Sequence, residues 1–127
     1  MRIAQFFGLA CIAVLAFDAL ASFASLAIGF NYGRASFGSA FMYMVFAFFC
    51  ARKFGFGSAF LLGTAMGLTD ATLGWAISWA IGPGRLADEI YSLSSVGFTA
   101  VLMVVLGATY GLIGGGIGAL TNRSAAA

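Results

Sequence analysis

Residues 63–78, which read GTAMGLTDATLGWAIS, place Asp70 in the middle of an apolar run that extends from 54 to 81. A helix needs about 20 apolar residues to cross a membrane, and this run is long enough. An aspartate at the centre of such a helix costs about 2.5 to 3.5 kcal/mol, which the flanking apolar side chains can outweigh. We therefore expect a membrane-spanning helix whose acid requires a hydrated cavity, a partner or a proton.

The composition of the whole chain indicates the same class of protein. Of its 127 residues, 62% are hydrophobic and only 8% are charged, whereas soluble domains carry about 25% charged residues. A chain of this length forms one domain, and its apolar content excludes a soluble or disordered protein. The net charge of +2 gives no reason to expect nucleic acid as a partner. Because the sequence has no histidine, we expect no metal centre of the zinc or haem type and no other cofactor.

Four apolar runs predict an all-α integral membrane protein with four transmembrane helices, which span about 3–30, 36–51, 55–81 and 90–120. The breaks between them are polar or contain glycine and the single proline of the chain. The second run is the shortest of the four and is rich in phenylalanine. The lipid bilayer is therefore the first partner that the sequence predicts.

One alternative concerns the first run. Residues 1–21 resemble a secretory signal peptide, with Arg2 ahead of an apolar segment and the cleavage-site pattern Ala-Leu-Ala at 19–21. Cleavage there would remove Asp18 and leave three spans. Apolar sequence continues past this point to Ile28, which favours a complete span instead.

An internal repeat relates the two acids. After Asp18 and again after Asp70 the sequence reads Asp-Ala, then small and aromatic residues, then Ala-Ile-Gly and Gly-Arg, at nearly equal spacing. We expect two parallel-repeat helical hairpins, residues 1–53 and 54–121, with a pseudo-twofold axis along the membrane normal. This symmetry would set the two carboxyl groups face to face at one depth, where both cannot readily carry a charge.

The helix faces around the acids carry small and weakly polar residues. Residues three, four and seven apart share a face, so Asp18 lies with Ser22 and Ser25, and Asp70 lies with Gly74 and Ser78. Such stripes face other helices in membranes. The hypothetical proton or ion site therefore consists of Asp18, Asp70, Ser22, Ser25 and Ser78. The alternative is that protonated acids only hold helices together.

Glycines at helical spacing predict tight helix packing. The predicted seam contains Gly63, Gly67, Gly74, Gly107, Gly111, Gly115 and Gly118. Small residues let two helix backbones approach closely. The seam can lie within one chain, between copies in a homo-oligomer, or against a larger membrane partner.

The positive charges predict the orientation. With the N-terminus inside, the cytoplasm receives Arg2, Arg52, Lys53 and Arg123, and the outside receives Arg34 and Arg85. Cytoplasmic loops carry the excess of Lys and Arg, so we expect a multi-pass protein of the cell (inner) membrane with both termini in the cytoplasm.

These observations favour proton- or cation-linked transport through the site at Asp18 and Asp70. The alternative is a structural or accessory membrane subunit that packs through its glycine-rich faces. We do not expect an enzyme, because serine and threonine occur without a histidine to act as their base.

Overall fold

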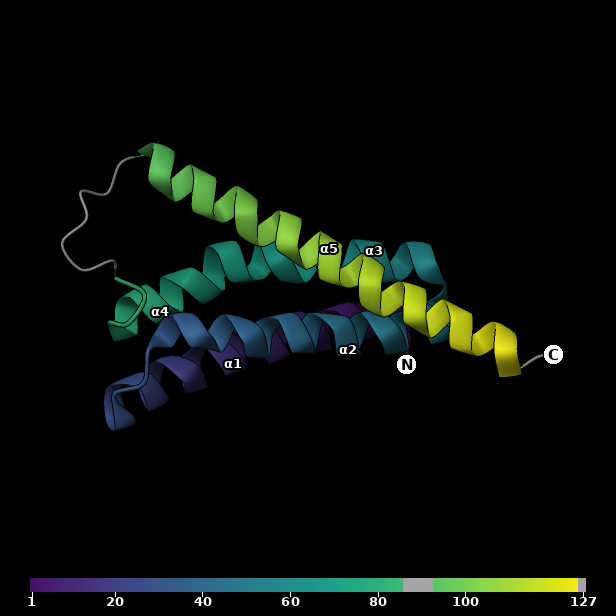
Figure 1. The fold of residues 1–127 in the computed structure, drawn as a ribbon, viewed down its shortest axis with the longest axis horizontal. Helices are drawn as coiled ribbons and strands as arrows, with labels where there is room; N and C mark the ends of the chain where they lie inside the picture. The colour runs from purple at the N-terminus through teal and green to yellow at the C-terminus, as the bar shows by residue number, and fades with distance from the viewer. Residues whose placement is uncertain (86–92, 126–127) are drawn as a thin grey trace.

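The computed structural model describes residues 1–85 and 93–125, with side chains to residue 122. Within these ranges, four helical segments are long and apolar enough to cross a membrane: Ile3–Ile28, Tyr32–Phe54, Phe56–Ile81 and Leu93–Asn122. The prediction of an all-α fold with four spans is therefore confirmed. The predicted start of the last span, at 90, lies outside the described residues. The start of the first helix and the end of the last helix lie at one end of the bundle (Figure 1).

The helices follow one another with short connections. Helix α1 spans Ile3–Ile28, the 3₁₀ turn η1 spans Tyr32–Ala35, and α2 spans Ser36–Phe54. The third span consists of three consecutive pieces, which are α3 (Phe56–Thr69), the π-helical turn η2 (Asp70–Gly74) and α4 (Trp75–Ile81). The last helix, α5, spans Leu93–Ala125. The second span thus continues beyond the predicted end at residue 51.

Glycines with positive φ end three of these helices: Gly29 ends α1, Gly55 ends α2 and Gly82 ends α4. Gly55 is the one residue between α2 and α3, and its φ of 93° lies in the region that side chains other than glycine rarely adopt. Its N–H donates to the carbonyl oxygen of Ala51 at 3.0 Å, which completes the last turn of α2. Gly82, with a φ of 134°, ends α4 and donates its N–H to the carbonyl oxygen of Ser78 at 2.9 Å. Each of these bonds pairs one of the last carbonyl oxygens of its helix before the chain reverses.

Helix α5 packs its backbone directly on α3. A Cβ atom added to Gly107 would lie 2.5 Å from the carbonyl oxygen of Gly63 and 2.8 Å from Cα of Gly67. A Cβ atom on Gly111 would lie 3.0 Å from Cα of Gly63. Since real Cβ atoms essentially never come closer than 3.0 Å, only glycine permits this approach. This packing is the small-residue contact typical of membrane helices.

Further along, α5 lies against both α2 and α3 (Figure 1). A Cβ atom on Gly115 would lie 2.7 Å from Cβ of Ala59, and one on Gly118 would lie 3.1 Å from Cα of Phe48. Six of the seven glycines of the predicted seam thus pack within the chain. Gly74, the seventh, lies in contact with the acids instead.

Apolar side chains fill the half of the bundle in which α1 begins and α5 ends. Its core contains Phe6, Ala10, Val14, Tyr43, Ala47, Cys50, Ala51, Ala59, Leu62 and Met66. The ring of Phe6 meets those of Phe46 and Phe54 edge to face, with centroids 6.0 and 5.8 Å apart. This half of the described bundle is closed by close packing.

At the opposite end, α5 diverges from the third span (Figure 1). In the described part of the chain α5 packs on α2, α3 and η2, but not on α4. A cleft of about 420 Å³ remains there, lined by Thr72, Trp75, Ala76, Trp79 and Val96. The two halves of the bundle therefore differ: one is packed, and the other contains open space.

Candidate ion site in the membrane interior

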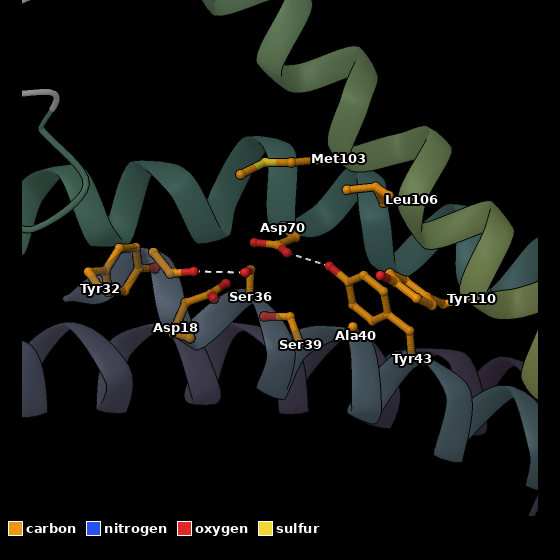
Figure 2. A pocket seen from close by; sticks show the side chains of 12 residues that line it. Asp18, Tyr32, Ser36, Ser39, Ala40, Tyr43, Asp70, Met103, Leu106 and Tyr110 are labelled. Atoms are coloured by element: carbon orange, nitrogen blue, oxygen red, sulfur yellow. Dashed lines mark hydrogen bonds between the residues drawn. The ribbon is translucent and has the colours of Figure 1, made fainter. Parts of the chain in front are cut away.

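The two acids of the predicted repeat line one cavity. Asp18, on α1, is buried with 3% of its surface exposed, and Asp70 is the first residue of the π turn η2. Both line a cavity of about 190 Å³ between the helices. Figure 2 shows the two carboxyl groups on facing sides of this cavity. The structure thus brings together two residues that are far apart in the sequence.

Gly74 allows the carboxyl groups to approach each other. A Cβ atom on Gly74 would lie 3.0 Å from Oδ1 of Asp70 and 3.2 Å from Cγ of Asp18, and it would collide with Oδ2 of Asp18. The space that any other side chain would fill therefore holds the two carboxyl groups. In the π turn, the N–H of Trp75 donates to the carbonyl oxygen of Asp70. Single π turns of this kind are frequent at functional sites.

Tyr43, on α2, completes the acid pair. Its side chain is 3% exposed, and its hydroxyl donates a hydrogen bond to Oδ2 of Asp70 (Figure 2). Sequence reasoning missed this residue. The available signal was a phenol in the middle of the second apolar run, because a buried tyrosine hydroxyl usually finds a hydrogen-bond partner.

The predicted serines separate into two groups. Ser22 lies one turn after Asp18, Ser78 lies one turn after Gly74, and both are fully buried. Their side chains lie near the hydroxyl of Tyr32. Ser25 lies elsewhere: its hydroxyl donates to the carbonyl oxygen of Phe30 at 2.9 Å, at the end of α1. The structure therefore brings Ser22 and Ser78 to the acids, but not Ser25.

A second and larger cavity connects the acids with one end of the bundle. It has a volume of about 780 Å³ and is lined by residues of both turns at that end and by Asp70, and we call it the vestibule. Its lining is Ser25, Leu26, Asn31, Tyr32, Gly33, Asp70, Trp75, Gly82, Pro83, Gly84, Arg85, Thr99 and Met103. The vestibule and the inner cavity share Tyr32, Gly33, Asp70 and Met103, so the two spaces adjoin. The two spaces thus extend from the acids toward the end that lies opposite the chain termini.

No basic residue in the sequence lies at the depth of the acids. The four spans contain five ionisable residues of the Asp, Glu, Lys or Arg type. Arg34, Arg52 and Lys53 lie near the two ends of the second span, and only Asp18 and Asp70 lie in the interior of a span. A carboxylate in a membrane interior needs a compensating charge or a proton. The structure therefore offers this acid pair no fixed positive charge as a partner.

Comparison with known proteins gives no match: no family model, no curated protein and no solved structure matches the chain. The class of protein is defined by the fold and the site, as a bundle of four apolar membrane-spanning helices with an acid pair in its interior. The function has to be argued from the chemistry of this site, because a fold by itself does not imply a function.

Proposed function

We propose that the chain is an integral protein of the inner membrane whose Asp18–Asp70 pair is a protonatable site for proton- or cation-linked transport. One observation carries this proposal: the two carboxyl groups face a cavity that adjoins a vestibule at one end of the bundle, with no fixed cation at their depth. Buried acids of this kind in membrane helices mark ion pathways and proton relays.

The depth of the pair suits such a site. Asp18 lies ten residues before the end of α1 at Ile28, which corresponds to about 15 Å along the helix, and Asp70 lies eleven residues before Ile81, about 16 Å. The hydrocarbon core of a bilayer is about 30 Å thick. Both acids therefore sit near the midplane, where many secondary transporters hold their substrate and coupling ions.

The chemistry follows from the pairing of the acids. Two carboxyl groups in contact do not both ionise readily, so the pair takes up a proton, a cation, or one of each. Loading takes place through the vestibule, while the apolar core around Phe6 and Leu62 closes the opposite path. Alternating access would require this core to open while the vestibule closes.

The orientation in the membrane is part of the proposal. The end that carries Arg2, Arg52, Lys53 and Arg123 is assigned to the cytoplasm, and the turns with Arg34 and Arg85 face the opposite side, following the rule for positive charges. The vestibule then opens away from the cytoplasm. A fluorescent protein fused to the C-terminus that folds only in the cytoplasm would test this assignment.

The internal repeat, with units 1–53 and 54–121, remains a proposal as well. The matching sequences after Asp18 and Asp70 support it, as does the position of both acids at one cavity. Helix packing gives it less support, since α5 packs extensively on α3 while α1 and α2 touch little. The repeat would thus explain why the chain has two similarly placed acids, but it would not explain how the two hairpins now pack.

A flux measurement tests the transport proposal. The purified full chain is placed in liposomes that contain a pH-sensitive dye, and a proton, Na⁺ or K⁺ gradient is imposed. We expect a flux in the wild type that Asp18→Asn and Asp70→Asn abolish while both variants remain folded. Thr64→Ala is the matched control, because Thr64 is half-buried, lines neither cavity, and its hydroxyl is bonded within α3 to the carbonyl oxygen of Phe60. If neither Asn variant alters flux in any of the three gradients, transport has to be abandoned.

The alternative of an accessory subunit receives less support. It relied on glycine faces that would bind a partner or a second copy of the chain, and Gly107, Gly111 and Gly115 are already occupied by α3. Substituting them would disturb the chain itself. Co-purification of a stoichiometric membrane partner with the unmodified chain, together with an absence of flux, would favour this alternative.

A further inference from the structure

Hydroxyl groups in the spans follow a common pattern. Each of six side chains donates to the backbone carbonyl oxygen four residues earlier: Ser58, Thr64, Thr69, Thr72, Thr99 and Thr109. This bond lets a hydroxyl enter an apolar environment without a loose polar group. The pattern sets the expectation for any buried serine in this bundle.

Ser22 and Ser78 depart from this pattern. Both are fully buried, and neither hydroxyl has a hydrogen-bond partner among the described residues. Oδ2 of Asp18 is the third buried side-chain oxygen without a partner in this part of the chain. An unpaired buried polar group is costly. Three such oxygens at one place indicate a ligand that would pair with them.

The oxygens belong to two neighbouring elements. Asp18 and Ser22 lie one turn apart on α1, while Asp70 and Ser78 lie at the start of η2 and on α4, and α1 packs on both η2 and α4. The hydroxyl of Tyr32 lies near both serines. Oδ1 of Asp70 and Oδ2 of Asp18 both lie beside the empty side-chain position of Gly74. Carboxylate and hydroxyl oxygens thus line one seam between α1 and the third span.

The chemistry of these groups selects the ligand. All are hard oxygen donors, which suit alkali and alkaline-earth cations rather than transition metals. No group of three or more His, Cys, Asp or Glu in the described part of the chain could hold a metal ion, whereas Ca²⁺ takes 6 to 8 oxygen ligands and Mg²⁺ keeps several waters. A carboxyl pair that shares one proton carries a single negative charge, which matches a monovalent cation. Na⁺ is favoured over K⁺ because it is satisfied by fewer oxygens.

We propose that Asp18, Asp70, Ser22 and Ser78 form a Na⁺ site in the seam between α1 and the third span. The inference rests on the proposed transport function and specifies its coupling ion. Tyr32 lines both the vestibule and the inner cavity, so it lies where the two spaces adjoin. A helix interrupted at Asp70 by a π turn resembles the discontinuous helices at which transporters coordinate Na⁺.

Binding of radioactive Na⁺ to the full chain in detergent tests this site, with choline chloride replacing other salts. Ser22→Ala and Ser78→Ala should each weaken Na⁺ binding about tenfold or more, because each removes one ligand. Ser58→Ala is the matched control: it also removes a serine hydroxyl from a spanning helix, but Ser58 lines neither cavity and its hydroxyl is bonded to the carbonyl oxygen of Phe54. Its Na⁺ affinity should equal that of the wild type.

Thermal unfolding gives a second measurement that separates binding from folding. In the absence of Na⁺, Ser22→Ala and Ser78→Ala should be as stable as the wild type or more stable, since they remove an unpaired buried hydroxyl. Na⁺ should raise the Tm of the wild type and of Ser58→Ala, because a ligand that binds only the folded state stabilises it. It should raise the Tm of the two test variants much less.

The outcomes distinguish this inference from the proposed function. If the wild type binds Na⁺ and both serine variants bind it equally well, the site lies elsewhere and the inference is wrong. If the wild type binds no Na⁺ but shows proton flux that Asp18→Asn abolishes, the Na⁺ site is overturned while transport stands. If the wild type shows neither Na⁺ binding nor flux in any gradient, both proposals fail.

Discussion

Replacing Gly74 by alanine should move the two carboxyl groups without removing either of them, so it tests the effect of their position apart from that of their charge. The added methyl group would lie 3.0 Å from Oδ1 of Asp70 and would collide with Oδ2 of Asp18. Ordinary contact begins at 3.4 Å, so at least one carboxyl group must rotate away. The variant keeps both acids and adds no polar atom. Any loss of ion binding then reports on geometry alone.

The expected change in stability is small. Turning a side chain of Asp18 off its preferred rotamer costs about 0.5 to 1.5 kcal/mol. Alanine in place of glycine within a helix stabilises the helix by about 0.5 to 1 kcal/mol. The free energy of unfolding of Gly74→Ala should therefore lie within about 1 kcal/mol of the wild type, by the difference of these two effects.

Ion binding should change far more than stability. Moving one carboxylate out of the coordination shell removes a charged ligand, so Na⁺ affinity should fall about tenfold or more, and flux with it. Gly116→Ala is the control, since a Cβ atom at this position of α5 meets nothing within 4 Å. If Gly74→Ala binds Na⁺ and supports flux as the wild type does, the carboxyl groups do not meet over Gly74 and the description of the site is wrong.

Two further predictions concern packing and the acid pair. Gly107→Ala should lower the free energy of unfolding by about 1 to 3 kcal/mol, because its methyl group would meet the backbone of α3. Denaturation in mixed detergent micelles would measure this change. Equal stability of Gly107→Ala and Gly116→Ala would contradict the described contact. Tyr43→Phe removes the donor to Asp70 and should cost about 1.5 to 3 kcal/mol. Its flux should also fall, and a variant with unchanged stability and unchanged flux would show that this hydrogen bond plays no part in the site.

The spans and the acids could be predicted from the sequence because both depend on local properties. A long apolar run determines a spanning helix, and an acid within it is informative because it is costly. The stripe of small residues around Asp70 also indicated a buried face, and the structure divides this stripe between two neighbours. Gly63 and Gly67 pack on α5, whereas Gly74 contacts Asp18 on α1.

Other parts of the site depend on tertiary packing and could not be read from the sequence. The π turn at Asp70 departs from the regular helical spacing used to assign faces. Tyr43 reaches Asp70 only because of the way α2 lies against the third span, and no pattern within α2 indicates its partner. Ser25 shares the face of Asp18 by spacing, but the end of α1 directs its hydroxyl to the carbonyl oxygen of Phe30. The vestibule arises from the divergence of α5, which likewise has no local signal.

The central claim is that the acid pair is reached from one end of the bundle only. Cysteine accessibility tests it most directly: Ser39, which lines the inner cavity, is changed to Cys in a chain that carries Cys11→Ala and Cys50→Ala. A small membrane-impermeant thiol reagent should label Ser39→Cys only from the side opposite the termini, and Ala47→Cys, in the closed core, from neither side. Labelling of Ser39→Cys from the side of the termini, or from neither side, would contradict the account.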